Sequence, residues 1–183
     1  MLAETTPWET IVAGLQAGKY DAVIGSMGIT EKRKKAVLFT KPYYHSGAQI
    51  FVREGNREIK TAEDMKGKKI GVVKASTYKD EAMKHSKKVK EYTSDVVALQ
   101  DLPTGRIDAV ITDEGVGDHA IKQDDLKIRK VGKPLTMDKM GIALNRNNPG
   151  LEMEINQALN QIIENGTYEK ISQKWFNRNI LSD

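Results

Sequence analysis

Three polar residues follow predicted β-strands at positions where an α/β protein can hold a charged ligand. Ser76 and Thr77 lie shortly after the apolar run 70–73, at the start of a predicted helix. Asp113 comes directly after the apolar run 107–112. Backbone N–H groups at a helix N-terminus favour an anion, and a carboxylate accepts hydrogen bonds from a cation. Because ligands of α/β sheets collect at the carboxyl ends of strands, these positions are candidate binding residues.

The same residue types also have ordinary structural explanations. Serine and aspartate are common helix N-caps, so capping alone explains Ser76 and Asp113. Arg33 lies in the run Lys32-Arg33-Lys34-Lys35 and by position alone is one more solvated basic residue. Neither metal-ligand spacing nor a dinucleotide-binding fingerprint is present, so the sequence predicts no metal and no cofactor.

Composition excludes several classes of protein. The chain has 183 residues, of which 39% are hydrophobic and 30% charged, as in ordinary globular domains. It has no cysteine, which excludes disulfides, zinc–thiolate sites and cysteine nucleophiles. No run of about 18 apolar residues exists, so no membrane-spanning helix is predicted. The net charge of +4 arises from lysine clusters without stacking aromatics, so no nucleic-acid partner is predicted.

Helical and strand patterns alternate along the chain, which predicts an α/β fold with mostly parallel strands. Residues 6–9, Thr-Pro-Trp-Glu, combine a capping box with a proline at the first helical position. Strands are predicted at 20–24 and 48–52, and strands and helices then alternate from a helix start at Thr61 to residue 131. Two amphipathic helices, separated by Asn165-Gly166, end the chain.

A change of composition after Glu54 predicts two lobes. Residues 54–142 form a complete α/β unit, lobe 2, inserted between residues 1–53 and residues 143–183, which together form lobe 1. The chain would then cross between the lobes twice, near residues 48–53 and near residues 140–144. A joint of this kind is a hinge, and lobes joined in this way close around a ligand.

Four segments together resemble one known family. They are LQAGKYDAVIGSMGITEKRKKAVLFTKPYYHSGAQIFVR, TAEDMKGKKIGVVKASTYKDEA, ALQDLPTGRIDAVITDEGVGDHAI and MGIALNRNNPGLEMEINQALNQIIENGTYEKISQKWF. The chain resembles the family 3 extracellular solute-binding proteins, which deliver polar amino acids to ABC importers, over essentially its whole length. The resemblance implies a type II periplasmic-binding-protein fold and binding of a free amino acid without catalysis.

The resemblance assigns roles to the charged candidates. Arg33 corresponds to the arginine that grips the α-carboxylate of the ligand, where guanidinium geometry suits a carboxylate better than lysine does. Asp113 corresponds to the acceptor of the ligand ammonium. Ser76 and Thr77 correspond to a hydroxyl pair that closes on the carboxylate. Ala75 stands where many members have glycine, so this loop is expected to be stiffer.

The resemblance also implies contacts from less polar residues. Ser26, Met27 and Gly28 occupy the contact loop of the first lobe, and many members have a hydroxyl residue at the position of Gly28. The chain therefore lacks one hydrogen bond to the ligand carboxylate, and weaker affinity is expected. Trp8 corresponds to an aromatic residue that stacks on the ligand side chain, although a core role explains it equally well. Val73 adds to a mostly apolar wall.

The chain departs from the family at its start. The resemblance implies about 45 further residues, a strand-helix-strand segment of the first lobe, before the part that matches residues 6–8. We expect the incomplete lobe to expose strand edges and an apolar helix face, and a second copy to cover them as a homodimer. The segment MLAETTPWET carries no export signal, so periplasmic, extracellular and cytoplasmic locations all remain open.

Two other functions are compatible with the residues. A few relatives on this scaffold are dehydratases acting on cyclohexadienyl substrates, a reaction that needs a general acid, and Glu114 is the acidic residue beside the predicted site. A truncated module that dimerises and no longer binds a ligand is the second alternative. The sequence does not distinguish among basic amino acids, glutamine and cystine-like ligands.

Overall fold

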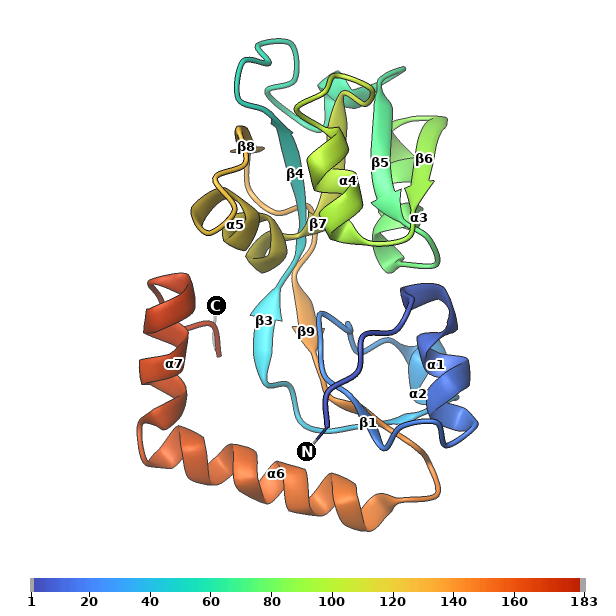
Figure 1. The fold of residues 1–183 in the computed structure, drawn as a ribbon, viewed down its shortest axis with the longest axis vertical. Helices are drawn as coiled ribbons and strands as arrows, with labels where there is room; N and C mark the ends of the chain where they lie inside the picture. The colour runs from blue at the N-terminus through green and yellow to red at the C-terminus, as the bar shows by residue number, and fades with distance from the viewer. Residues whose placement is uncertain (1, 182–183) are drawn as a thin grey trace. The chain divides into compact units, whose positions relative to one another are not determined.

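A computed structural model of the chain describes residues 2–181, which divide into two compact units (Figure 1). Unit 1 comprises residues 47–137 together with the segment up to Glu9, and unit 2 comprises residues 10–46 and the segment from Asp138 onward. The elements of unit 1 are β4 (Ala48–Arg53), η1 (Glu63–Met65), β5 (Lys69–Val73), α3 (Thr77–His85), β6 (Lys88–Tyr92), α4 (Asp95–Asp101), β7 (Ala109–Asp113), α5 (Glu114–Lys122) and β8 (Ile128–Val131).

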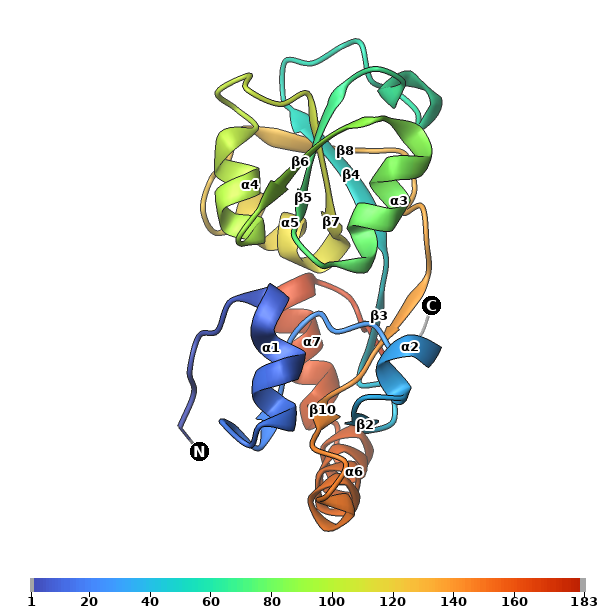
Figure 2. The same cartoon turned by 90° about the vertical axis from the view of Figure 1, so that its right-hand side faces the viewer.

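Unit 1 is built on one sheet of five strands in the order β6-β5-β7-β4-β8. Strand β5 pairs in parallel with β6 and β7, whereas β4 pairs antiparallel with β7 and β8. Helix α3 covers one face of this sheet, and α4 and α5 cover the other (Figure 2). Because β5, β6 and β7 run in the same direction, their carboxyl ends lie along a single edge of the sheet.

The alternation of side chains along each strand produces two cores in unit 1. On β4, Ile50 packs into the core under α3, while the next residue, Phe51, packs into the core under α4 and α5. Gly117 of α5 lies so close to the Phe51 ring that a Cβ atom there would approach it to 1.9 Å. Both faces of the sheet are therefore buried, as expected when helices cover each side.

Unit 2 contains only short strands. Its elements are α1 (Trp8–Gln16), β1 (Ala22–Val23), α2 (Glu31–Lys34), β2 (Leu38–Phe39), β3 (Tyr44–Ser46), β9 (Asp138–Met140), β10 (Ala143–Leu144), α6 (Pro149–Glu164) and α7 (Thr167–Phe176). Strands β1, β10 and β2 form an antiparallel sheet in that order, and β3 pairs antiparallel with β9. The first two residues of α1 are grouped with unit 1.

The core of unit 2 leaves much of its helical apolar surface half-exposed. Helix α6 is amphipathic over sixteen residues, yet Leu159 is its buried residue. On α7, Ile171 and Trp175 are 50% and 46% exposed and lie one helical turn apart. These two residues make an exposed apolar stripe on the outside of the helix.

The structure changes several predictions. The boundaries between units lie at residues 46/47 and 137/138 rather than at 53/54 and 142/143, because β4 pairs with β7 and β8 of unit 1 while β9 pairs with β3 of unit 2. The prediction of mostly parallel strands is wrong, since each pairing in unit 2 and those of β4 are antiparallel. The helix expected from Thr61 is a single 3-10 turn, η1.

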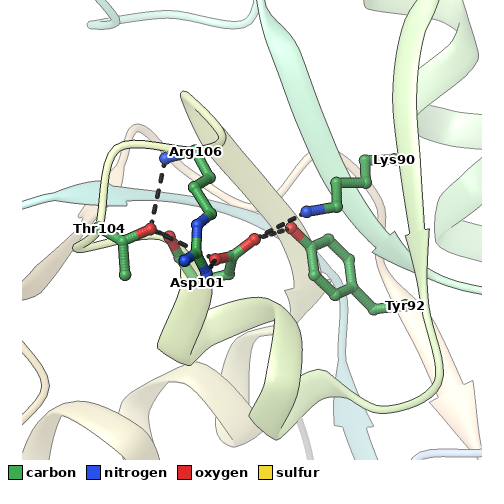
Figure 3. A network of polar contacts seen from close by, with 5 residues as sticks. All are labelled: Lys90, Tyr92, Asp101, Thr104 and Arg106. Carbon is green, nitrogen blue, oxygen red and sulfur yellow. Dashed lines mark hydrogen bonds and ion pairs between the residues drawn. The ribbon is translucent and has the colours of Figure 1, made fainter.

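A cluster of polar side chains ties α4 to β6 and to the loop before β7 (Figure 3). The Asp101 carboxylate accepts hydrogen bonds from the Tyr92 hydroxyl at 2.5 Å, from Lys90 Nζ at 2.9 Å and from Arg106 at 3.0 Å. The Thr104 hydroxyl also donates a hydrogen bond to the backbone carbonyl of Asp101, at 2.6 Å. The hydrogen bond from Tyr92 and those from the two cations hold the pKa of Asp101 well below its usual range.

Asp101→Asn is expected to lower the unfolding temperature at pH 7, because it removes a carboxylate that the fold stabilises in its charged form. A carboxyl group whose pKa is lower in the folded state stabilises the protein above its unfolded pKa of about 3.9 and loses this contribution as pH falls. The difference from the parent protein should therefore shrink in melts at pH 3. Asp125→Asn, which breaks the exposed pair with Lys127, is the control and should change little. An unaltered melting temperature at pH 7 would contradict the prediction.

Candidate functional site

The carboxyl edge of the unit 1 sheet brings together the residues predicted there. Val73 ends β5, and Ser76 and Thr77 follow it at the start of α3. Asp113 ends β7, the parallel neighbour of β5. Val73 is buried, whereas Ser76 is half-buried and Thr77 is exposed. The hydroxyl pair and the carboxylate therefore share one edge of one sheet, as the strand pattern predicted.

The loop between β5 and α3 has an unusual backbone. Ser76 is the N-cap of α3, but its hydroxyl donates to the Val73 carbonyl at 2.7 Å instead of capping the helix. The capping explanation of the Ser76 side chain is therefore wrong for this structure. Ala75 has a φ of 60°, in the left-handed region where glycine is usual. Many members of the family that the chain resembles have glycine at this position. The alanine here thus holds a backbone conformation that costs energy.

Ala75→Gly is expected to raise the free energy of unfolding by about 0.5–1 kcal/mol, because relief of the left-handed strain exceeds the added freedom of the unfolded chain. Ala62 has a φ of −64°, in the right-handed region, so Ala62→Gly is the matched control and should lower stability. Urea unfolding of both variants measures the two signs. A loss of stability in Ala75→Gly would contradict the argument.

Asp113 is a buried carboxylate whose two oxygens both have contacts within unit 1. It is 2% exposed, and its Oδ1 accepts the Val116 N–H at 3.2 Å as the N-cap of α5. The Tyr78 hydroxyl, from α3, lies 3.5 Å from its other oxygen, Oδ2. The capping role expected of Asp113 is thus observed.

Glu114, the acid required by the dehydratase alternative, is engaged elsewhere. Its carboxylate pairs with Lys130 Nζ at 3.0 Å, and the same ammonium lies 3.0 Å from Asp118. A general acid must carry a proton, whereas an ion pair with lysine stabilises the ionised carboxylate. The geometry in unit 1 therefore does not favour Glu114 as a proton donor.

Unit 2 holds the predicted guanidinium next to the predicted contact loop. Arg33 lies on the short helix α2, which begins after Thr30, and the Thr30 hydroxyl accepts the Arg33 N–H at 3.2 Å. One guanidinium nitrogen donates to the Gly28 carbonyl at 2.9 Å. This bond fixes the side chain against the loop, so the position of the guanidinium is determined by local structure rather than left to solvent.

The contact loop itself is tied to the strands around it. Tyr44 donates to the Ser26 hydroxyl at 2.8 Å, and Gly28 forms a bridge with Met140 of β9. Met27 is fully buried, so its side chain belongs to the core and only its backbone or its neighbours could reach a ligand. A Cβ atom on Gly28 would meet Arg33 and Met140 only at ordinary contact distances of 3.7 and 3.9 Å.

Trp8 is the last of the predicted site residues, and the structure also shows polar residues that the sequence did not predict. Trp8 is half-buried at the first position of α1. Tyr44 and Tyr78 were not predicted, although Tyr44 stands within the segment that carried the resemblance. Asp95 was also missed: Thr112 hydrogen-bonds to it, and burial raises the pKa of its carboxyl group.

Metal and membrane sites do not emerge from the geometry. Among residues 2–181, histidine, aspartate and glutamate side chains form no group of three that could hold a metal ion. Over the same part of the chain, each helix is too short or too polar to cross a membrane.

Comparison with known proteins identifies the family. The sequence pattern of the bacterial extracellular solute-binding proteins, family 3, matches residues 2–178. The chain belongs to this family. The L-cystine-binding protein TcyJ of Escherichia coli K12 is 33% identical over 178 residues, a match that covers 96% of this chain and 67% of TcyJ. The chain thus spans about two thirds of the length of this relative.

Solved structures of family members agree with the fold. An ancestral arginine-binding protein bound to glutamine is 41% identical, with a TM-score of 0.87 over 94% of this chain and 78% of that one. An ancestral amino-acid-binding protein, described as a precursor of cyclohexadienyl dehydratase, is 33% identical, with a TM-score of 0.84 over 93% of this chain and 75% of that one. The predicted α/β fold of type II periplasmic binding proteins is confirmed, and these relatives are binding proteins rather than enzymes.

Proposed function

We propose that this protein binds a free polar amino acid and delivers it to an ABC importer, without catalysis. The observation that carries the proposal is Asp113, a buried carboxylate at the carboxyl edge of the unit 1 sheet, on the same edge as the hydroxyls of Ser76 and Thr77. A carboxylate at this edge can accept hydrogen bonds from the ammonium of an amino acid. The resemblance to the family assigns the ligand carboxylate to Arg33, whose guanidinium geometry suits a carboxylate.

The chemical class of the ligand follows from its two ends. Cystine, arginine and glutamine, named for the relatives described above, share an α-carboxylate and an α-ammonium group and differ in a polar side chain. Arg33, Asp113 and the hydroxyl pair address only the shared groups. We therefore propose that the ligand is a polar amino acid. We also propose that the protein acts outside the cytoplasmic membrane, as members of its family do.

A thermal-unfolding screen against the twenty amino acids at millimolar concentration tests the function. A ligand at about 100 times its dissociation constant adds about 2.7 kcal/mol, which raises the unfolding temperature by about 5–10 °C in a chain of this size. A shift with one chemical group of amino acids supports the proposal. A sharp unfolding transition that no amino acid shifts contradicts it and favours the interaction module that has lost ligand binding.

Gly28→Ser is expected to tighten binding of the amino acid found in that screen by about tenfold. The hydroxyl would add a hydrogen bond to a charged group beside Arg33, and the site accepts a Cβ atom at ordinary contact distances. Gly28→Ala is the control, because it adds the Cβ atom without the hydroxyl. Isothermal titration of both variants measures the effect, and equal affinities in the two would contradict the prediction.

We also propose that two copies associate through unit 2. Ile171 and Trp175 form an exposed apolar stripe on α7, and the three-stranded sheet ends at β1, where Ile24 is exposed. Exposed apolar stripes and open strand edges favour association. Light scattering at micromolar concentration should give the mass of a dimer, and Ile171→Lys with Trp175→Lys should give a monomer. A monomeric parent protein would contradict the proposal.

A further inference from the structure

The positive charge of this protein is concentrated in one segment of unit 1. Residues 60–90 contain ten lysines and four acidic residues, a net charge of +6, while the whole chain carries +4. The rest of the chain is therefore net negative, at −2. A concentration of charge in one segment points to a particular surface rather than to a uniformly basic composition.

The lysines gather at the amino ends of β5 and β6. Lys69 begins β5, Lys88 begins β6, and the two are direct partners in the parallel register. Lys66 lies three residues before the start of β5, and Lys87 directly precedes β6. The amino ends are the edge of the sheet opposite to the one that carries Asp113, as the strand arrows show (Figure 1). The basic surface and the candidate ligand residues thus occupy opposite edges of the same sheet.

Four of these lysines have no carboxylate to neutralise them. Lys66, Lys69, Lys87 and Lys88 are exposed, and none forms an ion pair with any residue between 2 and 181. Like charges directly opposite each other on adjacent strands, as at Lys69 and Lys88, are unfavourable without a partner. The name lysine face is used below for these four residues.

Few acidic residues lie near the lysine face, and most of them already have an ion-pair or hydrogen-bond partner. Lys68 pairs with Glu58, and Lys84 pairs with Glu81 at 2.5 Å. One oxygen of Asp64 accepts backbone N–H groups at residues 60 and 61, and one oxygen of Asp108 accepts the backbone N–H at residue 69. Glu63 is the acidic residue that borders the surface. The lysine face keeps a surplus of positive charge after these interactions are counted.

The shape of the surface indicates what kind of partner it suits. A groove of about 580 Å³ runs beside it, bordered by Lys66, Lys87 and Lys88 and by the apolar side chain of Met83, which is 50% exposed. Within residues 2–181, the buried side-chain polar atoms that lack a hydrogen-bond partner lie at Ser46, Gln49 and Arg129, none of them in this groove. Nothing in the groove is preset to recognise one small molecule.

A nucleic acid is disfavoured at this surface. Binding of single strands relies on aromatic side chains that stack on bases. Tyr78, the aromatic residue of this segment, is buried in a core of unit 1, and so is Tyr92, which lies just beyond the segment. A cluster of flexible ammonium groups with an exposed apolar side chain among them suits phosphate headgroups and the lipid boundary beneath them.

We propose that the lysine face docks this protein on a membrane surface rich in anionic phospholipids. Each lysine near such a surface strengthens binding about fivefold. Docking through this edge of the unit 1 sheet leaves Ser76, Thr77 and Asp113 on the edge away from the lipid. The protein would thereby concentrate next to the membrane while its candidate ligand residues stay accessible.

Sedimentation with lipid vesicles tests the proposal on the full chain. The parent protein should bind vesicles of phosphatidylglycerol and phosphatidylcholine, and should not bind phosphatidylcholine alone. Binding should vanish near 1 M salt, where the screening length is about 3 Å. Substitution of the four lysines of the lysine face by glutamine should weaken binding at least about 100-fold. The control replaces four exposed lysines elsewhere by glutamine, at Lys19, Lys122, Lys133 and Lys170, and should still bind.

Three results would overturn the proposal. The parent protein could fail to bind the anionic vesicles, or the two quadruple variants could lose binding equally, which would indicate a response to net charge alone. The parent could also bind tripolyphosphate with one-to-one stoichiometry and ignore vesicles, which would indicate a site for free phosphates. Thermal unfolding of both variants shows that they are folded, and the amino-acid screen of each variant separates this surface from the proposed ligand function.

Discussion

Arg33→Ala is expected to weaken binding of the amino-acid ligand by about 100-fold or more. Arg33 is the residue proposed to bind the ligand carboxylate, and a hydrogen bond from one guanidinium nitrogen to the Gly28 carbonyl holds its side chain in place. Two charge-assisted hydrogen bonds contribute roughly 3 kcal/mol together, which corresponds to a factor of about 100 in the dissociation constant. Isothermal titration with the amino acid that stabilises the parent protein measures the loss.

Two further variants make the Arg33 result interpretable. Arg33→Lys keeps the charge but cannot form two parallel hydrogen bonds, so its affinity should fall between those of the parent and the alanine variant. Arg146→Ala is the matched control, because Arg146 also donates to backbone carbonyls of unit 2, at Lys34 and Lys35, at 3.0 and 2.8 Å. Its affinity should match that of the parent. Unchanged affinity in Arg33→Ala would remove Arg33 from the site.

Asp113→Asn is expected to weaken ligand binding by a similar factor while leaving the fold nearly as stable. Asparagine retains an oxygen that can accept the Val116 N–H and cap α5, but it removes the charge that is proposed to bind the ligand ammonium. Loss of one partner from a buried charge pair costs about 2–5 kcal/mol, or 30-fold to more than 1,000-fold in affinity. Titration calorimetry gives the affinity, and thermal unfolding without ligand gives the stability.

The capping and binding roles of Asp113 are separated by a second substitution. Asp113→Ala should lose about 1 kcal/mol of stability as well as affinity, because the cap is removed together with the charge. Asp118→Asn is the control: it alters a carboxylate of the same helix whose partner is Lys130, and affinity should not change. If Asp113→Asn bound the ligand as the parent does, the proposed ammonium site would be wrong.

Local sequence signals predicted the parts of the fold that depend on neighbouring residues. Asp113 was expected to cap a helix, and it accepts the N–H of Val116 at the start of α5. Asn165-Gly166 was expected to separate the last two helices, and α6 ends at Glu164 while α7 begins at Thr167. The strand that ends at Val73 and the strand that ends at Asp113 were likewise expected from their apolar runs. These elements could be predicted because the interactions that define them span only a few residues.

Pairings between distant segments escaped prediction. Strand β3 pairs with β9 across more than ninety residues, and β4 lies between β7 and β8. Both boundaries between the units therefore differ from the predicted ones. The short strands of unit 2 carry too few residues for a period to be visible. Register and partner choice depend on the whole sheet, and a single sequence does not contain that information.

The candidate site shows the same division. The sequence alone predicted its chemistry, because residue types at strand ends and helix starts, together with a family pattern over most of the chain, indicated Arg33, Asp113, Ser76 and Thr77. The tertiary structure decided which of these share an edge, that Ser76 does not cap α3, and that Glu114 pairs with Lys130. It also gathered unpaired lysines at the opposite edge of the unit 1 sheet. Local chemistry follows from covalent order, whereas distances between side chains far apart in sequence exist only once the sheet has formed.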